Sequence, residues 1–303
     1  MRKLNVAYIG NCSEEFSGVL DSFNGDLGTV ISVCDTDIKR GLICVEKYLC
    51  NFVEDYHAII SREEMNLVVI ESCGRLRQEE ICAAAASGKN IYVILDEQSL
   101  ILVDQVEAAV RESQAKFGTQ ALFVTVDELD NDFWSGLPVT KEEIGPLLQV
   151  TVGMPSRAPG SVSLNRNAYD AVRILYELLG VPETYLGMQG KVNEYSFTGA
   201  ASFRYPSGAL ASIVIGGVAR AHTVRVYGEK GCAMVGRNMI HYHLAEGPWK
   251  KEAIVLQKRR TRKPTISFQE IINGTRSPDI GHTLDEVLVT SRMLRTLLYP
   301  TGE

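Results

Sequence analysis

Asp35 has the residue type and the position expected of a group that binds a nucleotide. It directly follows residues 30–34, a β-branched and apolar run that predicts a buried strand. A carboxylate at the end of the second strand of a dinucleotide fold accepts hydrogen bonds from ribose hydroxyls, and it favours NAD because it repels the 2′-phosphate of NADP. Lys39 and Arg40 follow closely and soften that preference, and Arg40 is a second candidate cofactor contact. Asp35 could equally cap the next helix, so both interpretations stay open.

Gly10, Asn11 and Cys12 occupy the turn that would hold the cofactor's phosphates. A dinucleotide-binding turn carries glycines in the pattern G-x-G-x-x-G, which bring backbone amides and a helix N-terminus against the pyrophosphate. Only Gly10 is present here, and Glu14 and Glu15 stand in the first helical turn. Unit charges about 4 Å apart repel by ~1 kcal/mol in water and ~4 kcal/mol at an effective dielectric constant of 20. The turn therefore predicts either a penalised phosphate site or a self-capped helix that holds no phosphate.

The segment after the fifth predicted strand holds the candidate catalytic residues, Asp96 and Glu97. Oxidation of a carbinol requires a group that takes the hydroxyl proton as hydride leaves, and a lysine or a histidine does this near neutral pH. This segment reads Leu95-Asp96-Glu97-Gln98 and contains neither. Either carboxylate could act as a base if burial raised its pKa, but solvation is the more common state of such a pair.

His241 and His243 flank Tyr242 and would share one face of a strand. Two histidines on one face could bind a metal if a third ligand were present. The sequence indicates no third ligand, so we expect no metal site.

The first 125 residues alternate strand and helix, which indicates βαβ units and a parallel sheet. Strands are expected at residues 4–9, 29–34, 67–70, 91–95 and 121–126, and helices at residues 16–23, 38–49, 79–86 and 100–117. The alternation of strand and helix patterns ends after Val126, where an acidic and aromatic turn segment begins. We therefore expect a Rossmann-like domain over residues 1–125 and a second α/β domain over residues 126–303.

The second domain is expected to contain a large, mostly antiparallel sheet with one face covered by helices. Strands are predicted at residues 147–152, 196–205, 209–215 and 223–227, and helices at residues 168–179 and 283–298. Pro206-Ser207-Gly208 is a turn signal between two of these strands, and Gly180 is a helix stop.

Composition restricts the class of protein. The chain has 303 residues, of which 45% are hydrophobic and 22% charged, and its net charge is −6, which argues against nucleic-acid binding. The N-terminus lacks a signal-peptide pattern, and no apolar run approaches the ~18 residues of a membrane span. Seven cysteines without a C-x-x-C pair indicate reduced thiols, so we expect a cytoplasmic protein.

The order of these segments resembles the Gfo/Idh/MocA dehydrogenases, the family of glucose–fructose oxidoreductase and inositol dehydrogenase, over nearly the whole chain. Residues 66–70 and 83–93 are similar to the family passage D-x-V-x-I … A-x-x-A-G-K-x-V, and residues 226–231 are close to V-x-G-x-x-G. The other matching segments are residues 5–10, 33–35, 142–147 and 168–180. The resemblance implies NAD or NADP as cofactor and a small sugar-like or carbonyl substrate.

The resemblance also implies roles for particular positions. Ser72, after the fourth strand, would contact the cofactor, and Asn167 and Asp170 would contact the substrate. The family's Glu-Lys-Pro lysine has no counterpart in residues 95–98. The family's second-domain Asp and His fall near Ser163 and Asn167, and its proline and histidine after the fourth strand fall at Cys73 and Arg77.

Two functions remain open at this point. The missing lysine and histidine favour a catalytically impaired relative that serves as a binding, regulatory or partner subunit. The alternative is an active NAD(P)-dependent oxidoreductase with an atypical proton carrier. Because the resemblance implies assembly through the outer face of the second sheet, we also expect a homo-oligomer, and the alternating apolar residues of 209–215 fit such a contact.

Overall fold

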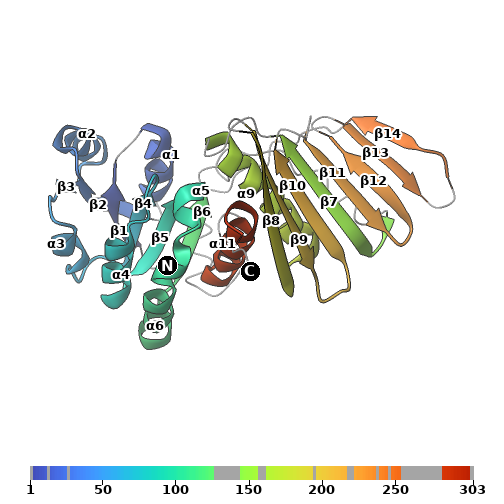
Figure 1. The fold of residues 1–303 in the computed structure, drawn as a ribbon. Coiled ribbons are helices and arrows are strands. Elements are labelled where there is room, and N and C mark those ends of the chain that lie inside the picture. The colour runs from blue at the N-terminus through green and yellow to red at the C-terminus, as the bar shows by residue number, and fades with distance from the viewer. Residues whose placement is uncertain are drawn as a thin grey trace. The chain divides into compact units, whose positions relative to one another are not determined.

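The chain forms two compact units, each built around one sheet (Figure 1). The computed structural model describes residues 3–11, 14–25, 28–125, 144–155, 162–193, 196–216, 222–236, 239–244, 247–253 and 282–300. Among these, the first unit contains residues 3–125 and 282–288, and the second contains the described residues from 144 to 253 together with 289–300. The predicted boundary after residue 125 adjoins a segment, 126–143, that lies outside the described residues, so it stays a prediction.

The first unit contains a six-stranded parallel sheet in the order β3-β2-β1-β4-β5-β6. Its strands are β1 (Leu4–Gly10), β2 (Gly28–Asp35), β3 (Asn51–Phe52), β4 (Leu67–Ser72), β5 (Asn90–Leu95) and β6 (Ala121–Thr125). Its helices are α1 (Glu14–Phe23), α2 (Ile38–Tyr48), α3 (Tyr56–Ile60), α4 (Gln78–Ala86), α5 (Glu97–Leu100), the 3-10 turn η1 (Val103–Val106) and α6 (Glu107–Phe117). This strand order is the doubly wound order of dinucleotide-binding domains and confirms the predicted Rossmann-like sheet.

Alternation along the strands builds two cores, one on each face of the first sheet. Tyr8, Val69 and Tyr92 are aligned in register and join one cluster with residues of α1 and α2, where Phe23 meets Tyr92 edge-on with ring centroids 5.1 Å apart. In each of these strands, the residues on either side of Tyr8, Val69 and Tyr92 are buried on the opposite face. Because Glu71 lies two residues after Val69, it belongs to the face that carries α1.

A ladder of amide side chains fixes the register at the amino edge of this sheet. Asn66 Oδ1 accepts the Asn5 backbone N–H at 2.9 Å, and Asn90 Nδ2 donates to the Asn66 carbonyl at 2.9 Å. Asn90 Oδ1 in turn accepts the Gln120 N–H at 2.9 Å. The ladder joins four strands by contacts that no hydrophobic pattern predicts.

The single helix expected over residues 100–117 is wrong, because the chain breaks it into α5, η1 and α6. The four residues Leu100, Val103, Val106 and Val110 are almost fully buried, and Ile101 is 9% exposed. Consecutive buried residues at 100 and 101 do not fit one helical stripe, and the chain turns there and then tightens into the 3-10 turn at Val103–Val106.

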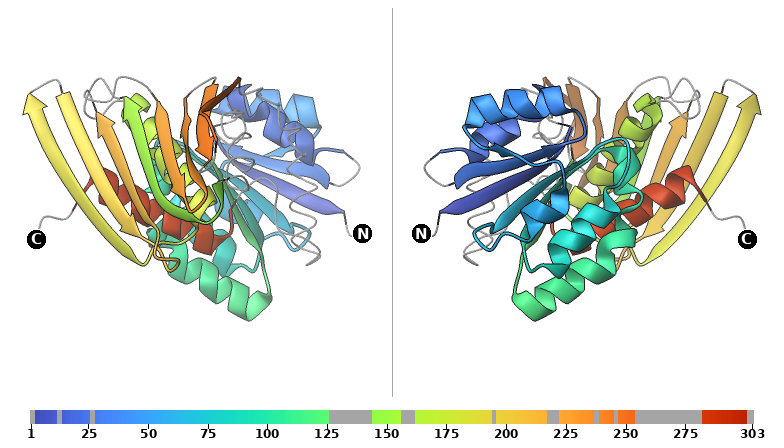
Figure 2. Two further views of the ribbon diagram at one scale, coloured as in Figure 1. Left: turned by 90° about the vertical axis from the view of Figure 1, so that its right-hand side faces the viewer. Right: turned by 90° about the vertical axis from the view of Figure 1, so that its left-hand side faces the viewer.

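The second unit contains an eight-stranded sheet in the order β14-β13-β12-β11-β7-β10-β9-β8. Its elements are β7 (Leu147–Pro155), α9 (Val162–Leu179), β8 (Thr184–Asn193), β9 (Ser196–Arg204), β10 (Leu210–Gly216), β11 (Thr223–Gly228), β12 (Gly231–Val235), β13 (Met239–Leu244) and β14 (Lys250–Ala253), together with the part of α11 (Leu284–Leu298) that follows Leu288. Every neighbouring pair is antiparallel except β7 and β10, which confirms the predicted mostly antiparallel sheet. Helix α9 packs on β7 and β10, and the C-terminal part of α11 packs on β8, on the same face of the sheet (Figure 2).

Strand β8 was not predicted, because Gly187 and Gly190 weaken its pattern. Gly187 has a packing reason: a Cβ there would collide with the Thr296 carbonyl of α11. The glycine that hides the strand from sequence analysis is the residue that lets α11 lie on it.

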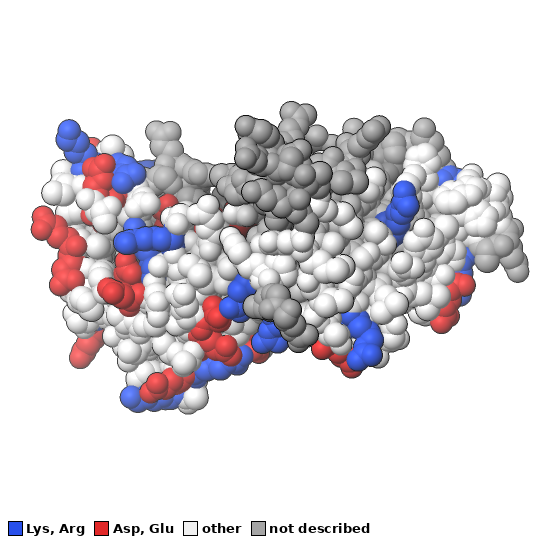
Figure 3. Space-filling view, in the orientation of Figure 1, with Lys and Arg blue, Asp and Glu red and all other residues white. Residues whose placement is uncertain are grey.

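Acidic and basic side chains are interspersed over the described surface in the view of Figure 3. Within the described residues, no helix is long and apolar enough to span a membrane. The six described cysteines are free thiols, and Cys12 lies outside the described residues.

Candidate functional site

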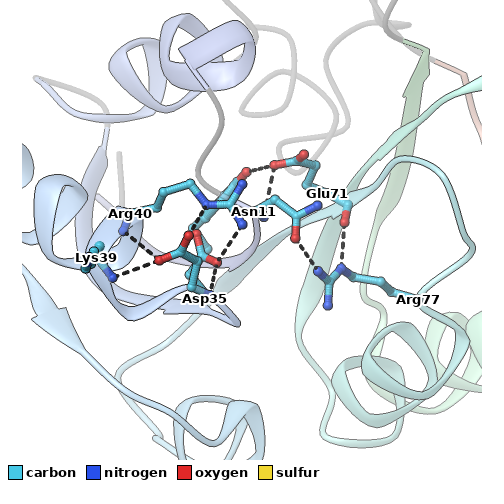
Figure 4. Close-up of polar contacts among 8 residues, drawn as sticks. Asn11, Asp35, Lys39, Arg40, Glu71 and Arg77 are labelled. Atoms are coloured by element: carbon cyan, nitrogen blue, oxygen red, sulfur yellow. Dashed lines mark hydrogen bonds and ion pairs between the residues drawn. The ribbon is translucent and has the colours of Figure 1, made fainter.

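The predicted cofactor residues lie at the carboxyl edge of the first sheet, around the point where strand order reverses between β1 and β4. Gly10 ends β1, Asp35 ends β2, and Ser72 ends β4, so all three come to this edge. Figure 4 shows Asp35 there with Asn11 and Glu71. Ligands of open α/β sheets bind at such a switch point. Cys12 was predicted beside Gly10 but lies outside the described residues, as do the side chains of Glu14 and Glu15.

The Asp35 carboxylate is buried and keeps one oxygen unused. Its Oδ1 accepts the Asp37 backbone N–H at 2.7 Å and lies 3.7 Å from Arg40 Nη2. Its Oδ2 is buried and has no hydrogen-bond partner among the described residues. The cap of α2 is Asp37, which accepts the Lys39 and Arg40 N–H groups, so the alternative that Asp35 caps this helix is wrong. A buried acceptor without a donor is costly, and a ligand hydroxyl would satisfy it.

Glu71 is a buried carboxylate at the same edge that sequence analysis missed. It is 3% exposed, and its Oε2 accepts hydrogen bonds from the Tyr8 hydroxyl and from the Asn11 backbone N–H, the latter at 3.2 Å. Burial raises the pKa of the Glu71 carboxyl, and the contacts with Tyr8, Asn11 and Arg77 oppose that rise. The available signal was a glutamate that continues the apolar run of β4 and therefore had to be buried with it.

Arg77 ties the turn after β4 to the turn after β1. Its Nε donates to the Glu71 carbonyl at 2.8 Å, its Nη2 to Asn11 Oδ1 at 3.0 Å, and its Nη1 pairs with Glu80 at 3.0 Å. Its backbone N–H donates to Ser72 Oγ at 2.9 Å. All three guanidinium nitrogens and the predicted cofactor contact Ser72 thus have partners within the protein.

Gly10 is required by this network. A Cβ at Gly10 would lie 2.6 Å from the Glu71 Cβ and 2.8 Å from the Tyr8 hydroxyl oxygen. Real Cβ atoms do not approach so closely, so any other residue at this position would force the Tyr8–Glu71 pair to move. The one glycine that survives from the predicted phosphate turn therefore has a structural reason to be there.

Asp96, the first candidate base, caps α5 and cross-links two turns. Its Oδ1 accepts the Ser99 N–H at 2.8 Å, and its Oδ2 accepts the Gly74 N–H at 2.6 Å. Its neighbour Glu97 is the first residue of α5 and is partly exposed. With both oxygens hydrogen-bonded to backbone amides, Asp96 has the geometry of a structural carboxylate.

The predicted substrate residues lie on α9 in the second unit. Asn167 donates from Nδ2 to the carbonyl of Pro155 at the end of β7, and Asp170 is partly buried one turn further along. The side chain of Ser163 lies outside those described. Among the described residues, no group of three or more histidine, cysteine, aspartate and glutamate side chains could hold a metal ion.

Solved structures with this fold include several dehydrogenases and reductases. Biliverdin reductase from Synechocystis sp. PCC 6803, in complex with biliverdin and NADP⁺, matches with a TM-score of 0.70 at 14% identity, over 96% of each chain. The WlbA dehydrogenase from Bordetella pertussis, in complex with NADH and UDP-GlcNAcA, matches with a TM-score of 0.67 at 16% identity, over 99% of this chain and 96% of that one.

Levoglucosan dehydrogenase, in complex with NADH and levoglucosan, matches with a TM-score of 0.66 at 13% identity, over 99% of this chain and 97% of that one. No protein-family model matches the sequence. No curated protein matches it at the level of sequence either. The likeness therefore establishes a fold shared with NAD(P)-dependent oxidoreductases over the whole length of the chain.

Proposed function

We propose that this protein binds a nucleoside-containing ligand on the scaffold of an NAD(P)-dependent oxidoreductase without catalysing hydride transfer, and that it serves as a binding, regulatory or partner subunit. The observation that carries the binding half is Asp35 Oδ2 at the carboxyl end of β2, a buried acceptor for which the described residues supply no donor. That is where a ribose hydroxyl is bound in dinucleotide folds. The spare oxygen supports a ligand with vicinal hydroxyl groups.

The groups around the expected reaction centre support the non-catalytic half. Hydride transfer from a carbinol needs a proton acceptor within hydrogen-bond reach of the substrate. Asp96 is engaged by two backbone amides, and the segment around it contains no lysine. Asn167 cannot accept a proton near neutral pH, and its amide already donates to Pro155. The alternative, an active NAD(P)-dependent oxidoreductase acting on a sugar-like or small carbonyl substrate, would need an atypical carrier such as Glu97.

Ligand titration with paired variants tests this proposal. Binding of adenosine and of NADH and NADPH is followed by calorimetry for the wild type and for Asp35→Ala and Asp37→Ala. We expect Asp35→Ala to weaken binding at least tenfold, because it removes the ribose acceptor. Asp37→Ala is the matched control from the same turn, since it removes a helix cap and should leave ligand affinity within about twofold.

Two results would contradict the proposal. If no adenosine-containing ligand binds at millimolar concentration, the site does not hold nucleosides. If reduced cofactor is consumed with a panel of sugar-like carbonyl compounds, and Glu97→Gln abolishes that turnover, the oxidoreductase alternative is correct.

We further propose that the protein assembles as a homo-oligomer through the face of the second sheet opposite α9. The alternating residues Ala211, Ile213 and Ile215 of β10 are buried inside their own unit, so they do not form this surface. Their strand neighbours face the other way, and four large side chains on that side are more than two-fifths exposed: Leu186, Met188, Leu210 and Tyr227. A monomer in sedimentation equilibrium would refute the assembly.

We also propose a cytoplasmic location, which the free thiols of all six described cysteines support.

A further inference from the structure

The backbone amides that follow β1 are the groups a Rossmann-like fold offers to a ligand phosphate. The first of them in this chain is the Asn11 N–H, and it already donates to a carboxylate of the protein, Glu71 Oε2, at 3.2 Å. A carboxylate and a phosphate are both anionic oxygen acceptors, so they compete for the same donor. Glu71 thus occupies the first backbone donor that this turn would offer to a ligand phosphate.

Two further contacts keep Asn11 in this arrangement. Arg77 Nη2 donates to its side-chain oxygen at 3.0 Å, while the Tyr8 hydroxyl holds the Glu71 carboxylate from the other side. Turning the Asn11 peptide toward a ligand would break its bond to Glu71 and strain its bond to Arg77. Asn11 is therefore held in place by side chains from β4 and from the segment between β4 and α4 (Figure 4).

The approach beside Gly10 is also filled. In a phosphate turn, glycine lets the ligand come close to the backbone. Here the side of Gly10 that lacks a Cβ is covered by the Glu71 Cβ and the Tyr8 hydroxyl, 2.6 Å and 2.8 Å from the position a Cβ would take. The space beside Gly10 that a ligand would use in such a turn is taken by the protein's own Glu71 and Tyr8 side chains.

Two buried carboxyl groups at this edge oppose a phosphate, and Arg40, the cation paired with Asp35, lies 3.7 Å from it. Glu71 and Asp35 are both buried carboxyl groups at the ends of strands that flank β1. Arg77 is the cation nearest to the Asn11 turn among the contacts described, but its three guanidinium nitrogens are bonded to Glu71, Glu80 and Asn11. A ligand with a neutral body and free hydroxyl groups meets Asp35 without meeting this opposition.

We propose that Glu71 is a built-in substitute for the ligand phosphate, and that the site consequently selects an uncharged nucleoside over nucleotides and dinucleotides. This rests on the proposed nucleoside binding at Asp35 and adds the ligand class. Asp35 supplies the ribose contact, and Glu71 is the specificity-determining residue that rejects a 5′-phosphate.

The test is a series of ligands that share adenine and ribose and differ in phosphate: adenosine, AMP, ADP and NADH, titrated calorimetrically into the full-length protein. We expect affinity to fall along the series, with adenosine at least tenfold tighter than ADP and NADH. 2′,3′-Dideoxyadenosine should bind at least tenfold more weakly than adenosine, because it lacks the hydroxyls that Asp35 would accept.

Two variants then locate the cause. Glu71→Ala vacates the Asn11 amide and should bring ADP and NADH to within threefold of adenosine. Glu71→Gln keeps a side chain of similar size at the Asn11 amide and removes its charge. If affinity for ADP and NADH recovers in both variants, the charge of Glu71 causes the rejection. If it recovers only in Glu71→Ala, the presence of the side chain causes it. Circular dichroism of each variant checks that it is folded. The comparison of ligands on the wild type tests the selectivity even if a variant fails to fold.

The outcomes separate this inference from the proposed function. If the wild type binds NADH or ADP as tightly as adenosine, nucleoside binding stands and the role of Glu71 is overturned. The same follows if adenosine binds and neither variant gains affinity for phosphorylated ligands. If nothing in the series binds to any of the three proteins, the proposed nucleoside site itself is wrong.

Discussion

Asp96 accepts the Gly74 backbone N–H at 2.6 Å and thereby joins the turn after β5 to the turn after β4. Its other oxygen caps α5 through the Ser99 N–H at 2.8 Å. Asp96 thus bonds one backbone amide in each of the two turns beside the candidate site. The residue predicted from sequence as a catalytic base instead holds two turns of the fold together through its hydrogen bonds.

Replacement of Asp96 should therefore cost stability. We expect Asp96→Ala to lower the free energy of unfolding by about 1–3 kcal/mol, since it removes a helix cap and leaves a second amide unpaired. Asp96→Asn is the matched control, because its side-chain oxygen can still cap the helix, and it should lose less than half as much. Urea denaturation measures both, and equal losses would argue against the capping role.

Gly10→Ala should destabilise the protein by about 1–3 kcal/mol, as expected for an inserted methyl that forces its neighbours apart. The added Cβ would strike Glu71 and the Tyr8 hydroxyl. Gly25→Ala provides the control, because a Cβ at that exposed position meets nothing within 4 Å. Its effect should stay within about 0.5 kcal/mol. If Gly10→Ala were as harmless as Gly25→Ala, the Tyr8–Glu71 pair would not be packed as described.

The buried carboxyl of Glu71 should make stability depend on pH. Burial raises its pKa in the folded protein above the ordinary value of 4.5. The folded state therefore holds this proton more tightly than the unfolded state, and the resulting stabilisation is complete below pH 4.5 and is lost as pH rises through the folded pKa.

Glu71→Gln removes this titration. The stability of the variant relative to the wild type should increase from pH 4.5 upward and level off above the folded pKa. Urea midpoints at a series of pH values measure the trend, with the exposed Glu79→Gln of α4 as the control. A difference between Glu71→Gln and the wild type that stays constant with pH would contradict the raised pKa.

Lys89 is a structural cation at the amino edge of the first sheet. Its ammonium donates to the Arg62 carbonyl at 2.6 Å and the Met65 carbonyl at 3.0 Å, and burial lowers its pKa. Lys89→Met should cost about 1–3 kcal/mol, because it leaves buried acceptors unpaired. The exposed Lys39→Met should change stability by less than about 0.5 kcal/mol. Thermal denaturation of the two variants side by side would decide the point.

Most of the first unit could be predicted because its strands are buried on both faces and read as short apolar runs between helices. The run at residues 67–70 and the β-branched run before Asp35 are examples, and both lie in the parallel sheet as expected. Strand β8 and the break in the helix expected over 100–117 could not be predicted. In the first case Gly187 is needed because α11 packs against it, which is a contact between distant residues. In the second, the burial of Leu100 and Ile101 overrides the helical spacing of apolar residues.

The candidate site was predicted in position but not in its chemistry. Gly10 and Asp35 come from local patterns that mark the ends of β1 and β2. Glu71 became a candidate only when the fold placed it beside Tyr8, which is 63 residues away in sequence. A polar contact between distant residues leaves no periodic trace, because it depends on which strands become neighbours.

The one parallel pair in the second sheet has a consequence for the order of folding. Strand β7 lies between β10 and β11, and residue 149 finds its partners at 210 and 227. The centre of this sheet therefore closes only after α9 and the β8–β9 hairpin have been synthesised, whereas that hairpin forms from neighbouring residues. Because loop closure must precede such distant contacts, the second unit should fold more slowly than its share of local hairpins suggests, with β7 the last central strand to be protected from hydrogen exchange.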